Sequence, residues 1–242
     1  MNKLSNFGYK KVTPKEKTIL VQKVFSNVAN NYDFMNDVMS FGAHRLWKKI
    51  FIDVINPLNG ELIIDVGSGS GDLVLEIKKK CTNTKIDIVD LNNEMLNEGR
   101  KRIKKAGVNF YLQNAENLSF KNNTYDKYLI SFCLRNVTDI NKSFKEALRI
   151  LKPGGQYFCL EFSKPNSFII SNIYSYYKAN LIPFFGKIFS NNRDAYSYLN
   201  ESIDIFPNQE DLKKRMENAG LKSVKFINLF DGIVSIHTEF KY

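Results

Sequence analysis

From residue 61 onward, short apolar runs alternate with helical stretches, and few folds accommodate this order of elements. The runs that we predict to be strands span 61–66, 85–89, 110–113, 127–132 and 156–162. The stretches that we predict to be helices span 73–80, 93–106 and 140–151, and the last of them is stopped by Pro153, Gly154 and Gly155. Strands that alternate with helices of this length favour a parallel sheet with helices on both faces. The sequence therefore predicts an α/β fold.

Two helices are predicted before this core. Thr13, Pro14 and Glu16 form a helix start, with Thr as the N-cap, Pro at the first helical position and Glu three residues after the cap. A second helix is predicted over 43–55 from its three- and four-residue apolar spacing, whereas 30–42 follows no regular amphipathic pattern.

After the core, 167–203 is a mostly helical, aromatic-rich insertion and 208–219 is a further amphipathic helix. A hairpin turned by Asp231 and Gly232 is predicted to close the chain. We therefore expect a single domain with a helical cap over 1–58, a ligand-binding core over 59–165, a helical insertion over 166–207 and a C-terminal helix and hairpin over 208–242.

Composition and targeting signals exclude several classes of protein. The 242 residues are 43% hydrophobic and 25% charged, which suits one globular domain and not a disordered chain. Cys81, Cys133 and Cys159 are widely spaced and lack a CxxC pair, so we predict neither a disulfide framework nor a metal site. The first twelve residues lack an apolar signal region, and no window of about 18 residues suits a membrane span. We expect a cytoplasmic protein, soluble or peripheral at the inner face of the membrane.

The formal net charge of +10 comes from 35 Lys and Arg against 25 Asp and Glu. Such an excess is typical of proteins that bind nucleic acid or an anionic membrane surface, but a solvated basic surface gives the same number. Net charge alone does not identify a partner.

A glycine loop joins the first predicted core strand to the helix that follows it. Asp65 stands before the loop, and Gly67, Gly69 and Gly71 allow a tight turn and a close approach of a ligand to the backbone. Asp90 closes the next predicted strand, 21 positions after Gly69, where a carboxylate can accept hydrogen bonds from both ribose hydroxyls. The pattern predicts a nucleotide site, and a plain tight turn with a helix-capping aspartate is the structural alternative.

The glycine spacing separates two kinds of nucleotide site. A dinucleotide fingerprint is GxGxxG, whereas this chain has GxGxG over 67–71. The loop resembles motif I of the class I S-adenosylmethionine-dependent methyltransferases, in which the preceding acidic residue helps to hold the methionine end. The stretches 114–116 and 151–155 are also similar to motifs of these enzymes. The resemblance implies their Rossmann-like fold, a mostly parallel seven-stranded sheet with an antiparallel C-terminal strand.

Longer segments narrow the resemblance to the quinone-biosynthesis C-methyltransferases, and it covers nearly the whole chain. The similar segments are Val24–Ala29, Tyr32–Asp37, Met39–Gly42, His44–Lys48, Ser131–Asp139, Leu160–Pro165 and Ala195–Ile203. Ser70 stands where Thr is common and Cys133 where Gly is common, and neither departure removes a charge. Members of this ubiquinone/menaquinone family methylate a ring carbon of a polyprenylated quinol, either 2-polyprenyl-6-methoxy-1,4-benzoquinol or demethylmenaquinol.

The resemblance implies S-adenosylmethionine as the methyl donor. The residues that it implies for binding are Asp65, Gly67, Gly69, Ser70, Gly71, Asp90, Asn114, Ala115 and Ser131. Asp90 would accept the ribose hydroxyls, and Asn114 with Ala115 would contact the adenine edge.

Ring C-methylation needs alignment of two carbons, exclusion of water and an electron-rich quinol oxygen, and it needs no metal. Arg135, just beyond a predicted strand end, is a candidate to stabilise a phenolate or to position a water, and a structural salt bridge is the alternative. Asp37 and His44 in the cap are candidates to touch substrate or to cap helices. Tyr32 and Trp47 are expected to pack and not to stack on the ring.

The aromatic stretch 167–189 has three interpretations: it lines a tunnel for the polyprenyl tail, it faces a homodimer partner, or it covers the sheet edge. Together with the net charge, it motivates the hypothesis of peripheral contact with anionic lipid.

Other functions fit the sequence less well. An RNA methyltransferase would suit the basic charge, but we find no appended RNA-binding module in the sequence. Base-directed enzymes often carry an Asn-Pro-Pro-Tyr-type loop after the fourth strand, and this chain has Ser-Phe-Cys-Leu there, over 131–134. No nucleic-acid partner is therefore expected. A non-catalytic scaffold of a quinone-biosynthesis complex is the second alternative. The GxGxG spacing disfavours a nicotinamide enzyme.

Overall fold

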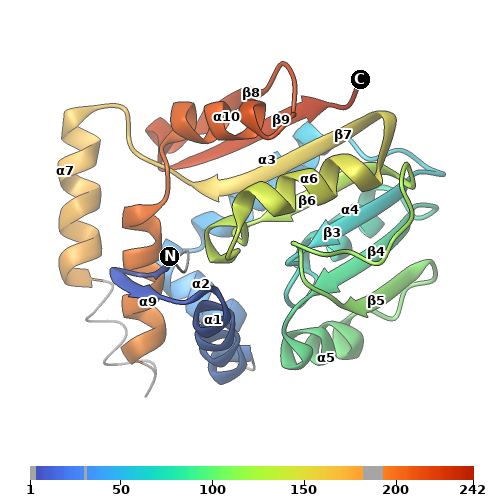
Figure 1. Ribbon diagram of the computed structural model, residues 1–242. Helices are drawn as coiled ribbons and strands as arrows, with labels where there is room; N and C mark the ends of the chain where they lie inside the picture. The colour runs from blue at the N-terminus through green and yellow to red at the C-terminus, as the bar shows by residue number, and fades with distance from the viewer. Residues whose placement is uncertain (1–3, 30–31, 182–192) are drawn as a thin grey trace.

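The structure is a computed structural model that describes residues 4–29, 32–181 and 193–242 (Figure 1). Its centre is a seven-stranded sheet of order β5–β4–β3–β6–β7–β9–β8. These strands are β3 (Leu62–Val66), β4 (Lys85–Asp90), β5 (Val108–Leu112), β6 (Tyr125–Ser131), β7 (Leu151–Phe162), β8 (Lys225–Leu229) and β9 (Val234–Phe240). β9 pairs antiparallel with both of its neighbours, β7 and β8, and the other pairings in this sheet are parallel. The mostly parallel seven-stranded sheet with an antiparallel C-terminal strand is therefore confirmed.

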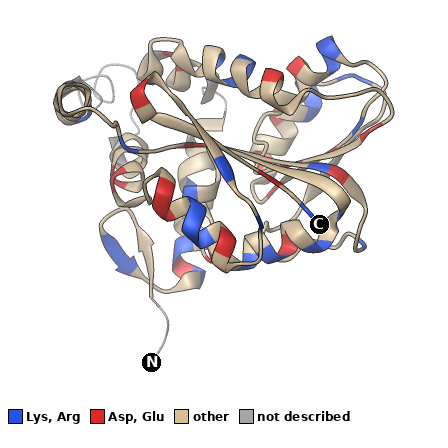
Figure 2. Ribbon diagram, turned by 90° about the horizontal axis from the view of Figure 1, so that it is seen from above, with Lys and Arg blue, Asp and Glu red and all other residues tan. Residues whose placement is uncertain are grey.

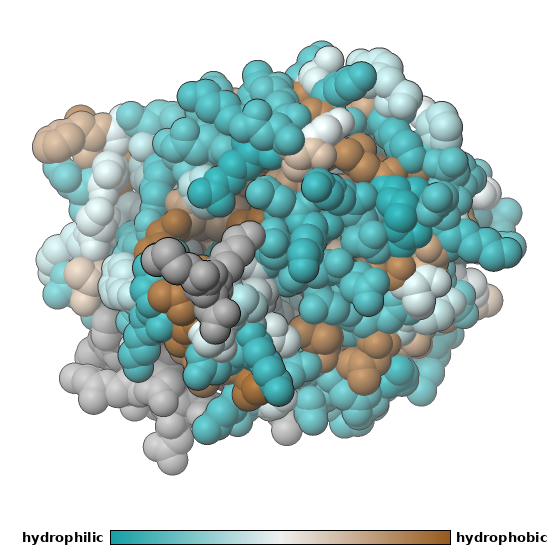
Figure 3. Space-filling view, in the orientation of Figure 1, coloured by the Kyte–Doolittle hydropathy of each residue, from teal (hydrophilic) through white to brown (hydrophobic). Residues whose placement is uncertain are grey.

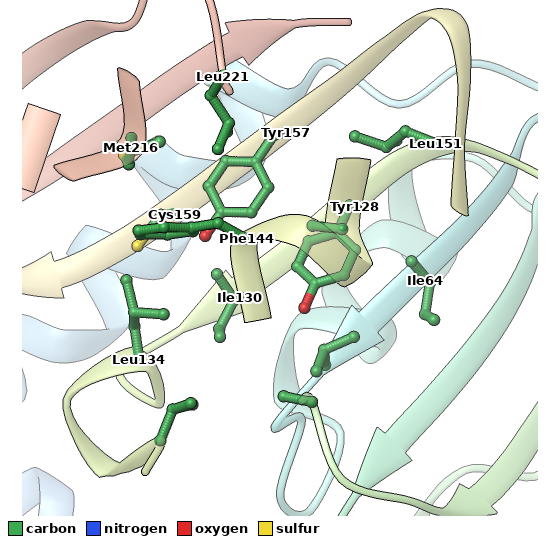
Figure 4. Close-up of a cluster of buried hydrophobic side chains, with 14 of the residues drawn as sticks. Ile64, Tyr128, Ile130, Leu134, Phe144, Leu151, Tyr157, Cys159, Met216 and Leu221 are labelled. Atoms are coloured by element: carbon green, nitrogen blue, oxygen red, sulfur yellow. The ribbon is translucent and has the colours of Figure 1, made fainter. Parts of the chain in front are cut away.

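Helices cover both faces of the sheet, as predicted. One core lies under α6 (Ile140–Ile150) and α10 (Gln209–Asn218), and the other lies under α3 (Ala43–Ile55), α4 (Asp72–Lys80) and α5 (Asn93–Arg102). In the first core the rings of Tyr128 and Tyr157 stack with centroids 5.2 Å apart, and Phe144 of α6 packs edge-on against Tyr157 (Figure 4). Burial on both faces explains why apolar residues predominate on both sides of the central strands.

The register of the sheet brings the ends of three strands together. Val66, the last residue of β3, pairs with Val89 of β4 on one side and with Ile130 of β6 on the other, and both pairings are parallel. The glycine loop, Asp90 and Ser131 therefore leave the sheet side by side at its carboxyl edge. Ligands of open α/β sheets bind at this edge.

A helical cap covers the carboxyl edge. Its helices are α1 (Pro14–Val28), α2 (Tyr32–Ser40) and α9 (Arg193–Ile205), which share a small third core containing Val28, Met35, Met39, Ala195 and Tyr196. The predicted start of α1 is confirmed, because Thr13 Oγ1 accepts a hydrogen bond from the Glu16 backbone N–H at 3.3 Å and the Glu16 carboxylate accepts one from the Thr13 N–H at 2.7 Å.

Several elements differ from the sequence prediction. The stretch 30–42, for which no regular pattern was found, contains the nine-residue helix α2, and a short hairpin of β1 (Ser5–Phe7) and β2 (Lys10–Val12) was not predicted. The helix predicted over 93–106 ends at Arg102, because Ile103 takes an extended conformation and is buried. Pro153–Gly155 stops α6 as expected but lies inside β7, where the pairing with β6 is irregular.

The insertion after β7 is helical where the structure describes it. It contains α7 (Phe168–Tyr176) and the π-helical turn η3 (Tyr177–Leu181), followed by α9. The part of the predicted aromatic stretch from residue 182 to 189 lies outside the described residues.

Candidate active site

The glycine loop takes a conformation that other residues would strain. Gly67, Gly69 and Gly71 have φ of 67°, 59° and 81°, in the left-handed region that favours glycine. A Cβ on Gly67 would lie 2.0 Å from Cys133 Sγ, and one on Gly71 would lie 2.3 Å from a methyl of Ile103. The loop therefore needs glycine both for its backbone angles and for its close packing.

Asp90 fastens this loop from the neighbouring strand. Its carboxylate accepts hydrogen bonds from the backbone N–H of Gly69 and of Asn92, both at 2.8 Å. Burial raises the pKa of Asp90, and these N–H donors partly offset that effect. The same carboxylate lines a cavity of about 100 Å³, so it both shapes the loop and faces the ligand space.

This smaller cavity lies between the carboxyl edge and α1. Its strand-end side includes Asn114 and Ala115, both predicted to contact adenine, and Cys133. Asn114 Oδ1 accepts a hydrogen bond from the Glu116 N–H at 2.9 Å, which fixes the turn after β5. Thr18, Val21 and Gln22 of α1 form the opposite side.

A larger cavity of about 240 Å³ lies on the other side of the glycine loop. Most of its wall is apolar and aromatic, and its polar members include Ser70, Ser131, His44 and Arg135. Residues that line both cavities are Phe25, Tyr32, Gly67, Gly69, Phe132 and Asn136. The two cavities therefore adjoin along the loop, which suits two ligands that must meet.

Asp65 and Ser70 place polar atoms beneath and beside the loop. Asp65 is buried, accepts a hydrogen bond from Ser68 Oγ at 2.5 Å, and keeps its Oδ1 without a partner among the described residues. Burial raises the pKa of Asp65 to about 7. Ser70 Oγ accepts a hydrogen bond from Arg102 at 2.9 Å, and Arg102 also pairs with Asp72 at 2.8 Å.

Arg135 forms a buried ion pair. Its guanidinium donates to Glu161 at 2.7 Å and to the carbonyl of Phe132 at 2.6 Å, and it lies 5.3 Å from the centroid of the Phe162 ring. Burial is the largest single effect and lowers the pKa of Arg135, but the charge and hydrogen bond of Glu161 together with Tyr32 and Tyr198 outweigh it and raise the pKa. The arginine therefore stays charged at the cavity wall.

His44 is a neutral group in the larger cavity. Its Nδ1 lies 2.9 Å from Ser40 Oγ, and burial followed by the charge of Lys48 lowers its pKa to about 4. A neutral imidazole can accept one hydrogen bond and donate another, and the lowered pKa makes His44 a weaker base than a solvated histidine.

The sequence of the chain matches a family of known proteins. The family model of the ubiE/COQ5 methyltransferase family matches residues 11–241. This chain belongs to the ubiE/COQ5 methyltransferase family. It is 46% identical over 245 residues to the ubiquinone/menaquinone biosynthesis C-methyltransferase UbiE of Rickettsia bellii and 45% identical to that of Rickettsia prowazekii, with 98% of each chain covered.

Solved structures agree with this methyltransferase fold. An S-adenosylmethionine-dependent methyltransferase from Thermotoga maritima has a TM-score of 0.67 at 22% identity, over 92% of this chain and 100% of that one. A phosphoethanolamine N-methyltransferase from Haemonchus contortus in complex with S-adenosylhomocysteine has a TM-score of 0.60 at 16% identity, over 80% of this chain and 52% of that one. At such identities the likeness shows the fold alone. The predicted family and class I fold are confirmed.

Within this ubiE/COQ5 chain, the structure separates the two catalytic candidates predicted in the cap. His44 lines the larger cavity. Asp37 instead makes two hydrogen bonds of 2.7 Å to Arg45 and is not among the described residues that line either cavity. Its Oδ1 lies 3.8 Å from His44 Nδ1.

The sequence prediction assigned no role to Glu161 or Asn136, although both stand in segments that resemble the ubiE/COQ5 family. Glu161 is fully buried and neutralises Arg135, and Asn136 lines both cavities while its Oδ1 accepts a hydrogen bond from Tyr198 at 2.9 Å. A charged residue inside the apolar run 156–162 was the signal for Glu161. No local signal links Asn136 to Tyr198, 62 residues away.

Proposed function

We propose that this chain transfers the methyl group of S-adenosylmethionine to a ring carbon of a polyprenylated quinol in ubiquinone or menaquinone biosynthesis. The observation that carries the proposal is the pair of cavities that adjoin along the glycine loop, one edged by Asp90 and Asn114 and the other largely apolar. A nucleoside suits the first cavity and an aromatic ring suits the second. The names of the similar UbiE proteins favour a quinol ring as the acceptor.

The residues of the smaller cavity fit S-adenosylmethionine. Asp90 offers carboxylate oxygens to a ribose, and the positive-φ glycines let the loop pack closely against Cys133, Met95 and Ile103 beside this cavity. Among the described residues, Asp65 lines neither cavity, but its unpartnered Oδ1 is a buried polar atom next to the loop, and Asp65 stays a predicted contact of the amino-acid portion. Ser70, Ser131, Asn114 and Ala115 stay predicted contacts.

When bound, S-adenosylmethionine supplies an electrophilic methyl group on a positively charged sulfur. The chain's own part is to align the acceptor carbon, to exclude water and to manage the charge of the quinol oxygen. Alignment contributes the most, on the order of 7–11 kcal/mol at best. The apolar wall of the larger cavity, with Trp47, Phe132 and Phe162, suits a planar ring and excludes water.

His44 and Arg135 have separate roles in this proposal. His44 is neutral at pH 7 and can accept a hydrogen bond from a quinol hydroxyl, whereas Arg135 stays charged and stabilises the oxygen as it becomes negative. Asp37, paired with Arg45, acts only through the orientation of His44.

Calorimetric titration of S-adenosylmethionine against the wild type, Asp90→Ala and the matched surface variant Asp53→Ala tests the donor site. We expect Asp90→Ala to weaken binding by about 2 kcal/mol or more, roughly 30-fold, because it removes charge-assisted hydrogen bonds, and Asp53→Ala to bind as the wild type does. Asp90→Asn keeps one acceptor for the Gly69 N–H and separates loss of the ribose contact from loosening of the loop.

Mass spectrometry of a benzoquinol or naphthoquinol incubated with S-adenosylmethionine then tests the acceptor. A product heavier by one methylene identifies the ring. Wild-type protein that binds no S-adenosylmethionine would contradict the catalytic proposal and favour the non-catalytic scaffold.

The localisation and assembly of the protein stay predictions. No helix among residues 4–29, 32–181 and 193–242 is long and apolar enough to cross a membrane. We propose a cytoplasmic protein that contacts the inner face of the membrane peripherally and that forms a homodimer or joins a quinone-biosynthesis complex.

A further inference from the structure

Helix α7 exposes an unusual amount of apolar surface. It stands at the margin of the molecule, apart from the sheet, in both ribbon views (Figures 1 and 2). The exposed fractions of its apolar side chains are 78% for Phe168, 70% for Ile169, 61% for Ile173 and 68% for Tyr176. No residue of α7 is buried among the described residues. In Figure 3 this margin shows patches of tan among pale and teal atoms. A helix of nine residues is marginal by itself in water, so an apolar environment on its outer side would stabilise it.

The two sides of α7 serve different surroundings. Tyr174, and Tyr177 just after the helix, line the larger cavity. Ile169, Ile173 and Tyr176 are spaced by four and three residues, so they form one stripe on the outer side. This stripe is apolar where a water-facing helix would be polar.

Phe41 and Tyr177 form the part of the larger cavity's wall that lies next to α7. The Tyr177 hydroxyl donates a hydrogen bond to the Met39 carbonyl, and its ring lies 5.7 Å from the ring of Phe41. Phe41 lines the larger cavity and is nevertheless 72% exposed. The exposed ring of Phe41 therefore lies beside both the larger cavity and Tyr177, the residue that follows α7.

Charge favours a lipid surface as the occupant of this region. The segment 165–181 contains no Asp or Glu and a single basic residue, Lys178, which is paired with Asp204. An uncharged helix in a chain of net charge +10 can enter the boundary between headgroups and acyl chains while basic residues elsewhere attract anionic lipid.

We infer that α7 is a membrane-docking helix whose Phe168, Ile169, Ile173 and Tyr176 insert into the surface of a phospholipid bilayer. The inference rests on the proposed function, since a polyprenyl tail would pass from the bilayer to the larger cavity along Phe41 and Tyr177. The cavity of about 240 Å³ holds a ring and the start of a tail, so the remainder of a long tail stays in the lipid.

Flotation with vesicles of phosphatidylcholine, alone and mixed with phosphatidylglycerol, tests the docking. The wild type is compared with Ile169→Ser/Ile173→Ser and with the control Leu58→Ser/Ile227→Ser, which changes two exposed apolar residues (56% and 47%) away from α7. We expect the α7 variant to bind both kinds of vesicle at least tenfold more weakly and the control to bind as the wild type does. Wild-type protein that floats with neither vesicle, or an α7 variant that floats as well as the wild type, would overturn the inference.

Two further measurements separate this inference from its alternatives. Methylation of a tail-less, water-soluble quinol should be equal in the wild type and the α7 variant, whereas a long-tailed quinol in vesicles should show a raised KM in the variant with kcat retained. A wild type that binds vesicles but methylates neither the soluble nor the long-tailed quinol refutes the proposed function and leaves the docking measured by flotation. The α7 substitutions could instead convert a wild-type dimer to a monomer and leave vesicle binding unchanged. That result would mean that α7 binds a second copy of the chain, and it would overturn the inference.

Discussion

Gly67→Ala should destabilise the fold through two effects that can be measured separately. Alanine at φ of 67° costs about 1–2 kcal/mol because its Cβ crowds the carbonyl in the left-handed region. The added Cβ would also lie 2.0 Å from Sγ and 2.6 Å from Cβ of Cys133, against an ordinary contact of about 3.5–4.0 Å, and relief of such overpacking costs about 1–3 kcal/mol more. We expect a total loss of about 2–5 kcal/mol in the free energy of unfolding.

Urea unfolding of matched variants tests this reasoning. Gly154 has φ of 78° with nothing within 4 Å of an added Cβ, so Gly154→Ala should show the backbone cost alone, about 1–2 kcal/mol. Cys133→Gly removes the clashing side chain, so a double-mutant cycle of Gly67→Ala with Cys133→Gly should give a coupling energy of about 1–3 kcal/mol. A cycle with no coupling, or a Gly67→Ala variant no less stable than Gly154→Ala, would refute the packing argument.

Two further predictions concern the buried ionisable groups. Glu161→Gln should lower the free energy of unfolding by about 3–5 kcal/mol, because it leaves the buried Arg135 without its ion-pair partner. The control Asp53→Asn removes an exposed ion pair with Lys80 and should change the free energy of unfolding by less than about 1 kcal/mol. Thermal unfolding that shows comparable losses for the two variants would contradict this prediction. Burial lowers the pKa of His44 and His237 to about 4, so below about pH 6.5 the unfolded chain binds protons that the folded chain does not. Stability should therefore fall as the pH drops from about 6.5 to 4, by up to about 1.4 kcal/mol per pH unit for each histidine, and urea titrations of His237→Gln should show a shallower fall than the wild type.

Much of the fold was predictable because its signals are local. The runs that form β3, β4 and β6 are short and mostly apolar, since parallel strands are buried on both faces, although charged residues such as Asp65, Asp87 and Lys127 interrupt them. The start of α1 lies in three neighbouring residues, Thr13, Pro14 and Glu16. Elements without such signals were missed: α2 is short and mixes exposed Phe34 with buried Met35, and it is ordered by packing against α1 and α9.

The candidate site was predictable to the same extent. The glycine loop and Asp90 follow from spacing along the chain, and the structure joins them by the hydrogen bond from Gly69 to Asp90. Which of the cap residues faces a cavity did not follow from spacing. His44 and Asp37 lie seven positions apart in neighbouring helices, yet one lines the larger cavity and the other pairs with Arg45.

The sequence by itself determined the order of the core strands and helices after residue 61, the need for glycine in the loop and the family to which the chain belongs, because each depends on residues close together in the chain. Only the tertiary structure decided the partners of the charged groups. Arg135 meets Glu161 across 26 positions, and the Lys17 ammonium on α1 donates to the Val137 carbonyl across 120. Such pairs depend on which strand ends and cap helices the topology brings together, and periodicity along one segment carries no information about its distant neighbours.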